Sequence, residues 1–252
     1  MPVDPTVTAD DHALAAQLAT EAGELLVDLR AKVDSSVASW RLGDLGDWEA
    51  HKLLVARLAE LRPDDAVLSE EGREDPARLT APRVWIVDPL DGTREFGEVP
   101  RIDWAVHVAL VVGGVAVAGA VALPAQEITL ASQPAPVVPP APPGPPRMVV
   151  SRSRPSEETG RIAAALGAEQ RPLGSAGAKA MAVVQGDADI YAHAGGQYEW
   201  DSAAPVAVAA AAGLWTSRLD GSPLVYNRPD PYLPDLVICR QELAESVLAA
   251  LR

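Results

Sequence analysis

The chain has 252 residues, of which 48% are hydrophobic, so it can form a substantial core in one large domain or two smaller ones. Its 21 basic and 35 acidic residues give a formal net charge of −14, which disfavours nucleic acid and anionic membranes as partners. The single cysteine, Cys239, excludes a disulfide framework and fits a reducing compartment. Residues 1–4 lack a leader pattern and no apolar stretch reaches membrane-spanning length, so we expect a cytoplasmic protein.

Two helices are predicted in the N-terminal part of the chain. Apolar residues recur at helical spacing over residues 10–33, and Thr8 is a candidate N-cap. A second helix is predicted from Asp47 until Pro63 ends it, with the glycine-containing residues 42–46 as a loop before it. Asp47 would then lie at a helix N-terminus, where a simple capping role is the common one.

A buried strand that ends in two aspartates is the feature that most constrains the chemistry. Residues 84–87 are apolar and mostly β-branched, and Asp88 and Asp91 follow within the motif Asp-Pro-Leu-Asp-Gly-Thr. Such a run must be covered on both faces, so its end delivers both carboxylates to the sheet edge where α/β proteins place their ligands. Gly92 allows the backbone to approach a phosphate. By itself, the motif is equally compatible with a surface turn.

Two further acidic segments favour a metal site over a turn. Glu70 and Glu71 follow the strand-like residues 66–68, and Asp201 follows Trp200 at the start of an alanine-rich helix. Each segment places a carboxylate at the end of an element, and oxygen-only ligand sets suit a hard cation such as Mg²⁺. The 4 histidines show no paired ligand spacing, so we assign proton removal to metal and carboxylates rather than to imidazole.

The rest of the chain predicts a sheet, a connector and a second α/β unit. Proline content rises at residues 133–147, which predicts a stiff, extended connector, with docking onto an aromatic-lined groove as the alternative. We expect an N-terminal subdomain of residues 1–132, with most metal ligands, and a C-terminal subdomain of residues 148–252 that completes the site. Strands are predicted at 104–112, 115–123, 127–131, 148–150, around 173, 189–191, 214–217 and 236–239, and helices at 156–166, 177–184, 201–212 and 241–251.

In type, order and approximate spacing, the acidic blocks resemble those of the inositol monophosphatase superfamily of Mg²⁺-dependent, lithium-sensitive phosphatases. The blocks are Glu70-Glu71, residues 85–93, and residues 200–204 with the later Ala212-Gly213. The resemblance covers nearly the whole chain and implies an α/β (α+β) fold, a layered αβαβα sandwich, with two or three Mg²⁺ ions around an in-line displacement. The implied metal ligands are Asp47, Glu70, Asp88, the Leu90 carbonyl, Asp91 and Asp201, and the implied catalytic residues are Asp47, Glu70, Asp91 and Thr93.

Within the superfamily, three details are similar to the CysQ branch, the 3′-phosphoadenosine 5′-phosphate (PAP) phosphatases. Arg94-Glu95-Phe96 follows Thr93, Lys179 ends a stretch that begins at Gly174, and residues 220–226 read Asp-Gly-Ser-Pro-Leu-Val-Tyr. The resemblance implies release of the 3′-phosphate of PAP to give AMP, which clears a by-product of sulfate assimilation, and, by analogy, a homodimer. The implied substrate-binding residues are Gly92, Thr93, Arg94, Ser175, Lys179 and Asp201.

The substrate and several supporting residues keep more than one interpretation. The same catalytic core is compatible with inositol 1-phosphate or fructose 1,6-bisphosphate. A protein of another class would keep the fold without catalysis and bind a partner through the proline-rich tract, but an intact cluster of like charges without metal is costly. Asp44 is a third-metal ligand or, as we favour, a solvated loop acid. For Lys179 and for Arg152, the alternatives are contact with a phosphate group and a solvated position on the surface. For Tyr198, the alternatives are stacking on the base of the substrate and a place in the core.

Overall fold

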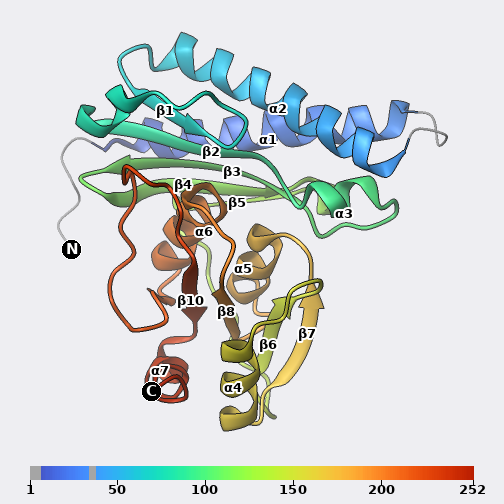
Figure 1. The fold of residues 1–252 in the computed structure, drawn as a ribbon, viewed down its shortest axis with the longest axis vertical. Helices are drawn as coiled ribbons and strands as arrows, with labels where there is room; N and C mark the ends of the chain where they lie inside the picture. The colour runs from blue at the N-terminus through green and yellow to red at the C-terminus, as the bar shows by residue number, and fades with distance from the viewer. Residues whose placement is uncertain (1–6, 34–37) are drawn as a thin grey trace.

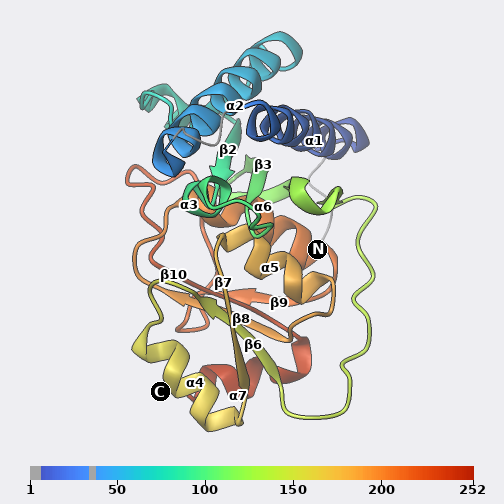
Figure 2. The same cartoon turned by 90° about the vertical axis from the view of Figure 1, so that its right-hand side faces the viewer.

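Layers of helices and sheets alternate in the order αβαβα, as the resemblance predicts (Figure 1 and Figure 2). The computed structural model describes residues 7–33 and 38–252, so residues 1–4, on which the expectation about a leader depends, lie outside the described part. The α-helices are α1 (Ala9–Lys32), α2 (Ser39–Leu61), α3 (Thr93–Gly97), α4 (Glu157–Leu166), α5 (Ala176–Val184), α6 (Glu199–Ala211) and α7 (Ala244–Ala249). The strands are β1 (Ala66–Ser69), β2 (Arg83–Asp91), β3 (Ala105–Val112), β4 (Val115–Leu123), β5 (Ile128–Ala131), β6 (Arg147–Ser151), β7 (Glu169–Leu173), β8 (Ile190–Ala194), β9 (Trp215–Ser217) and β10 (Asp235–Cys239), and 3₁₀ helices span Pro76–Thr80, Pro124–Gln126 and Gln241–Leu243.

The first sheet has the strand order β1-β2-β3-β4-β5, and it positions the acidic residues. Helices α1 and α2 cover one face, and α5 and α6 cover the other (Figure 2). Because both faces are covered, residues 84–87 of β2 are buried, as their unbroken apolar run predicts. The parallel pairing of β1 with β2 sets Ser69 opposite Val87, so that Glu70 and Asp88 leave the sheet side by side.

The second sheet has the order β7-β6-β8-β10-β9, and α4 and α7 lie on its outer face (Figure 1). Residues 133–146 contain no helix or strand and run as an extended loop along one side of the molecule (Figure 2). The core between the sheets draws on both sides of this tract, because Ile86 of β2, Met181 of α5 and Ile238 of β10 belong to one buried cluster. The division into two subdomains at the tract stays a prediction. Within residues 7–33 and 38–252, no helix combines the length and apolarity that crossing a membrane requires.

The start of helix α2 corrects a prediction. The helix begins at Ser39 rather than at Asp47, so Asp47 lies inside it and does not cap its N-terminus. Residues 42–46 are helical and do not form the predicted loop. Asp44 is exposed on this helix, which agrees with the solvated interpretation although not with its place in a loop.

The glycines that suggested a loop serve helix packing instead. A Cβ atom on Gly43 would lie 2.7 Å from Thr93 Cγ2, and one on Gly46 would lie 2.8 Å from Phe96 Cε1. Both distances are too short for carbon atoms that are not bonded to each other. Glycine at these positions therefore lets α3 pack closely on α2, and the benefit offsets the lower helix propensity of glycine.

Candidate functional site

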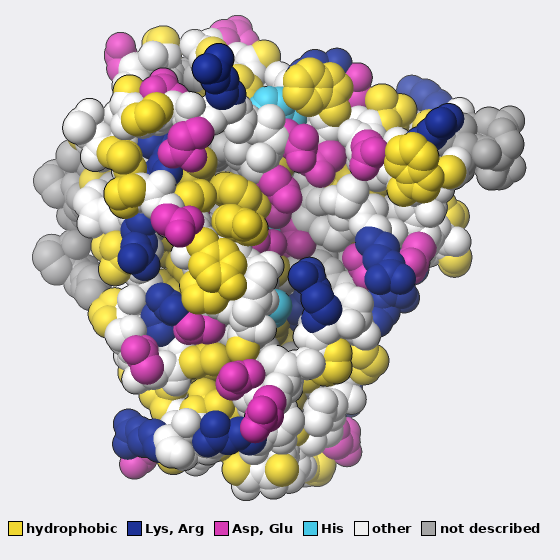
Figure 3. All heavy atoms as spheres, viewed as in Figure 1, with side chains coloured by type: hydrophobic (Ala, Val, Ile, Leu, Met, Phe, Trp, Pro, Cys, Tyr) yellow, Lys and Arg dark blue, Asp and Glu magenta, His cyan; other side chains and the backbone are white. Residues whose placement is uncertain are grey.

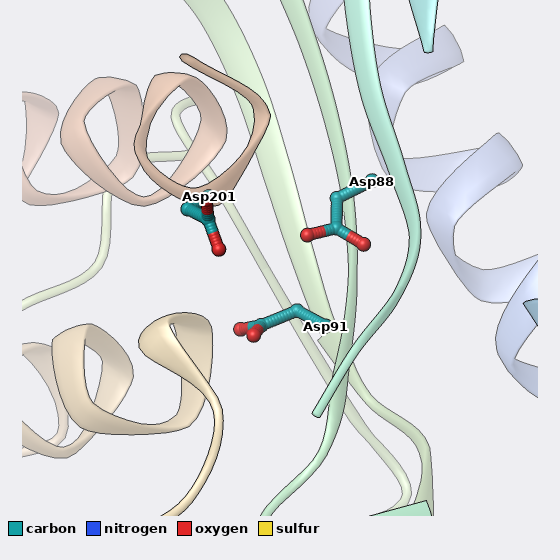
Figure 4. Close-up of side chains that lie close together, drawn as sticks. All are labelled: Asp88, Asp91 and Asp201. Carbon is teal, nitrogen blue, oxygen red and sulfur yellow. The ribbon is translucent and has the colours of Figure 1, made fainter. Parts of the chain in front are cut away.

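Three aspartates converge at one edge of the first sheet. Carboxylate oxygens of Asp88, Asp91 and Asp201 lie within 4.8 Å of one another, and the side chains point into a common space (Figure 4). Asp88 and Asp91 end β2, and Asp201 lies in the first turn of α6. Residues three apart in a regular strand face opposite sides, but here the segment from Asp88 to Asp91 pairs with the shorter segment from His107 to Ala105 of β3. This bulge turns both carboxylates to the same side.

Glu70 and Asp47 extend the acidic group. Glu70 is exposed in the turn after β1, where its backbone NH donates to the Val87 carbonyl at 3.4 Å. Asp47 is buried, and Thr93 Oγ1 donates to its Oδ2 atom at 3.5 Å, whereas its Oδ1 atom has no hydrogen-bond partner in the described part of the chain. A cavity of about 540 Å³ is lined by every site residue that the sequence predicts except Asp47.

Loss of surrounding water and mutual repulsion raise the pKa values of four of these acids. Burial, followed by repulsion from Glu71, raises the pKa of Asp47 to about 7. Loss of surrounding water and repulsion from Asp91 raise the pKa of Asp201 to about 7. Loss of surrounding water and the charges of Asp47 and Asp201 raise the pKa of Glu70 to about 8. The same causes raise the pKa of Asp88 well above its ordinary value. A group of acids in this state is suited to bind a cation.

Asp91 is the exception, because three groups surround its Oδ2 atom. The Ser175 hydroxyl donates to it at 2.5 Å, the Gly177 backbone NH donates at 2.6 Å, and His107 Nε2 lies 3.2 Å away. Burial alone would raise the pKa of Asp91, but His107, the charge of Lys179 and the Ser175 hydroxyl lower it below its ordinary range. Its Oδ1 atom has no protein partner within the described ranges, so one oxygen is bound by protein and one is left for a ligand.

His107 contacts the acidic group, although its sequence context does not mark it as a site residue. It is fully buried on β3, where it pairs with Asp88 of β2. Burial alone would lower the pKa of His107, but the Asp91 carboxylate beside Nε2 and the Trp200 carbonyl raise it overall. The spacing of the histidines along the chain does not indicate that His107 belongs to the site. The antiparallel pairing of the two predicted strands is the signal that places His107 behind the aspartates.

The residues predicted to bind phosphate lie where β2 leads into α3. Gly92 has a φ of 88°, which glycine adopts without strain, and α3 begins directly after it. Thr93 Oγ1 also lies 3.1 Å from the Leu90 carbonyl, to which it donates. Arg94 is exposed at the cavity, where it forms an ion pair with Glu98 at 3.1 Å. This segment therefore lines the cavity with backbone, a hydroxyl and one exposed cation.

Ser175 and Lys179 line the cavity as predicted, but both already make several hydrogen bonds. The Ser175 hydroxyl accepts from the Ala178 backbone NH at 2.9 Å, which caps α5, while it donates to Asp91. Lys179 is only 4% exposed, and its ammonium donates to the carbonyls of Gly174 and Ser175, the latter at 2.7 Å. Burial lowers the pKa of Lys179 to about 8. The alternative of a solvated helix lysine is therefore wrong.

Two arginines after β6 differ in their surroundings. Arg152 forms ion pairs with Glu95 at 2.5 Å and Glu98 at 2.9 Å, which favours a structural role on α3 over contact with phosphate. Arg154 is exposed, lines the cavity and forms no ion pair with any described residue. Tyr198 lies outside the cavity lining and is 41% exposed, so it is not a core residue.

The surface around the site carries both signs of charge. On the face shown in Figure 3, acidic side chains gather below the layer of α1 and α2, and basic side chains border them on one side. The net charge of −14 would repel a small anion at long range. An anionic ligand at this site therefore needs bound cations or the local basic groups to reverse the field.

Comparisons with known proteins show the family to which the chain belongs. The model of the inositol monophosphatase family matches residues 11–252. The chain is 52% identical to the 3′-phosphoadenosine 5′-phosphate phosphatase of Mycobacterium leprae, over 96% of this chain and 93% of that protein. It is 31% identical to the 3′(2′),5′-bisphosphate nucleotidase CysQ of Escherichia coli, over 86% of this chain and 94% of that one. The crystal structure of CysQ from Bacteroides thetaiotaomicron superposes with a TM-score of 0.78 at 28% identity, over 92% of this chain and 97% of that one. The resemblance seen in the acidic blocks is therefore confirmed, and the chain belongs to the inositol monophosphatase family.

Proposed function

We propose that the chain is a Mg²⁺-dependent phosphatase that hydrolyses the 3′-phosphate of PAP to give AMP and inorganic phosphate. The observation that carries the proposal is the convergence of Asp88, Asp91 and Asp201, with Glu70 close enough to repel them. Similarity over nearly the full length to a protein named PAP phosphatase supports the substrate. The donors are all oxygens, and Asp47 Oδ1 is buried without a partner among the described residues, so the set fits a hard cation.

The proposal assigns two or three Mg²⁺ ions to this site. The proposed ligands are Glu70, Asp88, the Leu90 carbonyl, Asp91 and Asp201, with Asp47 helping to bind a third ion. When bound, such ions neutralise the charge of the phosphate and lower the pKa of a water molecule. Thr93 donates its hydroxyl hydrogen to protein acceptors, so its lone pairs can accept from the attacking water. Asp47 orients the same water, and the backbone NH groups of Gly92 and Thr93 donate to phosphoryl oxygens.

The second phosphate of PAP is the reason to prefer this substrate to inositol 1-phosphate. Lys179 places a buried positive charge at the cavity wall, and Arg154 offers guanidinium donors that no described residue uses. A nucleoside bisphosphate matches both parts of the cavity, since one phosphate meets the acidic metal site and the other meets the cations. Fructose 1,6-bisphosphate also has two phosphates, so it is the main competitor.

A side-by-side assay of phosphate release tests the proposal. PAP, inositol 1-phosphate and fructose 1,6-bisphosphate are compared at saturating Mg²⁺, with a parallel series in excess chelator. We expect the highest kcat/KM for PAP and loss of all release in chelator. A higher kcat/KM for either competitor would contradict the nucleotide assignment, and release that survives the chelator would contradict the metal assignment.

Three expectations accompany the proposal. The buried free thiol of Cys239 fits a reducing compartment, so we place the protein in the cytoplasm. A homodimer and sensitivity to lithium stay predictions from the resemblance to the family. The proline-rich tract is not proposed as a docking ligand, because the acidic site gives the chain a use that needs no protein partner.

A further inference from the structure

His107 occupies a junction between three elements that form the acidic site. It lies on β3 opposite Asp88 of β2, and its ring contacts the first turns of α5 and α6. In α5, a Cβ atom on Gly177 would overlap His107 Nε2, so only glycine admits the ring. The His107 side chain has no exposed surface and does not line the cavity. It therefore acts on the site from behind the ligands.

Both ring nitrogens of His107 contact segments that carry a ligand. Nδ1 donates to the Trp200 carbonyl at 3.0 Å, and Trp200 directly precedes Asp201 in the first turn of α6. Nε2 lies 3.2 Å from Asp91 Oδ2 at the end of β2. One rigid, buried ring thus joins two segments that lie on opposite sides of the proline-rich tract in the chain.

The join opposes a repulsion within the site. Carboxylate oxygens of Asp91 and Asp201 lie within 4.8 Å of each other, so the two groups repel each other when both are ionised. Without a cation, this repulsion favours separation of α6 from the end of β2. A divalent ion, however, requires ligand atoms within a narrow range of positions, and groups that orient ligands control metal affinity for this reason.

We propose that His107 is a positioning residue for the metal site. It fixes Asp91 and Asp201 at the separation that a divalent cation requires, and it contacts neither the cation nor the substrate. The inference rests on the proposed function, because it presupposes a divalent ion at these aspartates.

The test measures metal binding separately from turnover. Binding of Mg²⁺, and of Mn²⁺ as a spectroscopic probe, is measured by calorimetry and paramagnetic resonance on the folded wild type, His107→Leu and His107→Asn. His107→Leu loses both contacts, and we expect its Kd for the ion to rise by about 10–100-fold. His107→Asn keeps one donor for the Trp200 carbonyl, so an intermediate Kd is expected. At saturating metal, kcat and KM for PAP should stay within about threefold of the wild type, because His107 does not touch the substrate.

The control variant is His12→Asn. His12 also forms a hydrogen bond through Nδ1, with Ser132 Oγ at 2.7 Å, but neither residue lines the cavity. Its Kd for the ion should not change. An unchanged Kd in folded His107→Leu would overturn the inference, as would a large loss of kcat that saturating metal does not restore. If His107→Leu does not fold, His107→Asn takes its place, and an unchanged Kd for the ion in that variant would overturn the inference. A wild type that binds neither ion would instead overturn the proposed function and, with it, this inference.

Discussion

Two groups of acids in this molecule have opposite surroundings. Asp189 accepts hydrogen bonds from Arg147 at 2.8 and 2.9 Å and from Arg240 at 2.7 Å. Burial alone would raise its pKa, but these arginines lower it to about 2. Asp88 is also buried and Asp201 is half-buried, yet neither forms an ion pair with an arginine or lysine in the described residues, and the pKa values of both are raised.

The difference separates acids that the protein neutralises from acids that it leaves for a ligand. Around Asp189, the countercharge is part of the fold, so the carboxylate stabilises the native state. Around Asp88 and Asp201, loss of water and repulsion between carboxylates outweigh the nearby favourable groups, so further countercharge has to come from outside. Burial or acidity alone does not distinguish the two groups, whereas the arginine ion pairs do, because Asp189 has them and Asp88 and Asp201 lack them among the described residues.

Neutralising one acid from each group is the most direct test of this difference. Asp88→Asn should lower kcat for phosphate release by about 10³-fold, because a metal ligand is lost, and should leave the metal-free protein at least as stable as the wild type. Asp189→Asn should leave kcat nearly unchanged and lower the free energy of unfolding by about 3 kcal/mol, because the buried Arg240 and the half-buried Arg147 lose their partner. Steady-state kinetics and denaturant unfolding in chelator measure both effects. If Asp88→Asn destabilised the metal-free protein as much as Asp189→Asn does, the two groups would not differ.

The next prediction concerns stability as a function of pH without metal. The raised pKa values of Asp47, Glu70 and Asp201, at about 7 to 8, mean that the folded state holds protons that the unfolded chain releases near pH 4. Stability should therefore fall as the pH rises from about 4 to 8. The lowered values of Asp11 and Asp189, about 2, contribute stability that is lost as the pH falls from about 4 to 2.

Thermal unfolding in chelator should thus show a maximum near pH 4 to 5. Mg²⁺ at 100 times its Kd should add about 2.7 kcal/mol at neutral pH, because binding needs ionised carboxylates and is linked to folding. The added stability should disappear as the pH falls to about 4, where the site binds protons instead. A metal-free protein whose unfolding midpoint rises steadily from pH 4 to 8 would contradict the assigned repulsion.

The smallest expected effect concerns the cations at the edge of the acidic group. Arg154→Ala should raise KM for PAP by about fivefold and leave KM for inositol 1-phosphate unchanged, since an exposed charge contributes at most about 1 kcal/mol. Arg161→Ala, which removes an exposed arginine from α4 outside the cavity, is the matched control. Equal changes of KM for the two substrates would remove Arg154 from the binding of a second phosphate.

The sequence predicts the elements around the site where the pattern is local, and misses features that depend on distant contacts. The apolar run before Asp88 predicts strand β2, and the glycine at position 92 predicts the turn that ends it. Convergence of the acids is expected because each acidic segment lies at the end of an element, and the resemblance of these segments to a family supports it. The start of α2 was missed because Gly43 and Gly46 suggest a loop unless their contacts with α3 are known. His107 was missed because its partner carbonyl lies 93 residues away in the chain.

The three groups around Asp91 Oδ2 also bear on which ion the site accepts. With hydrogen bonds from Ser175 and Gly177 on that oxygen and His107 beside it, only Oδ1 is left, so Asp91 cannot coordinate an ion through both oxygens. Ca²⁺ takes six to eight oxygen ligands, often with bidentate carboxylates, whereas Mg²⁺ requires a compact octahedron. The hydrogen bonds to Asp91 Oδ2 thereby reduce the number of oxygen atoms that the site can offer to an ion. The site should therefore bind Ca²⁺ more weakly than Mg²⁺.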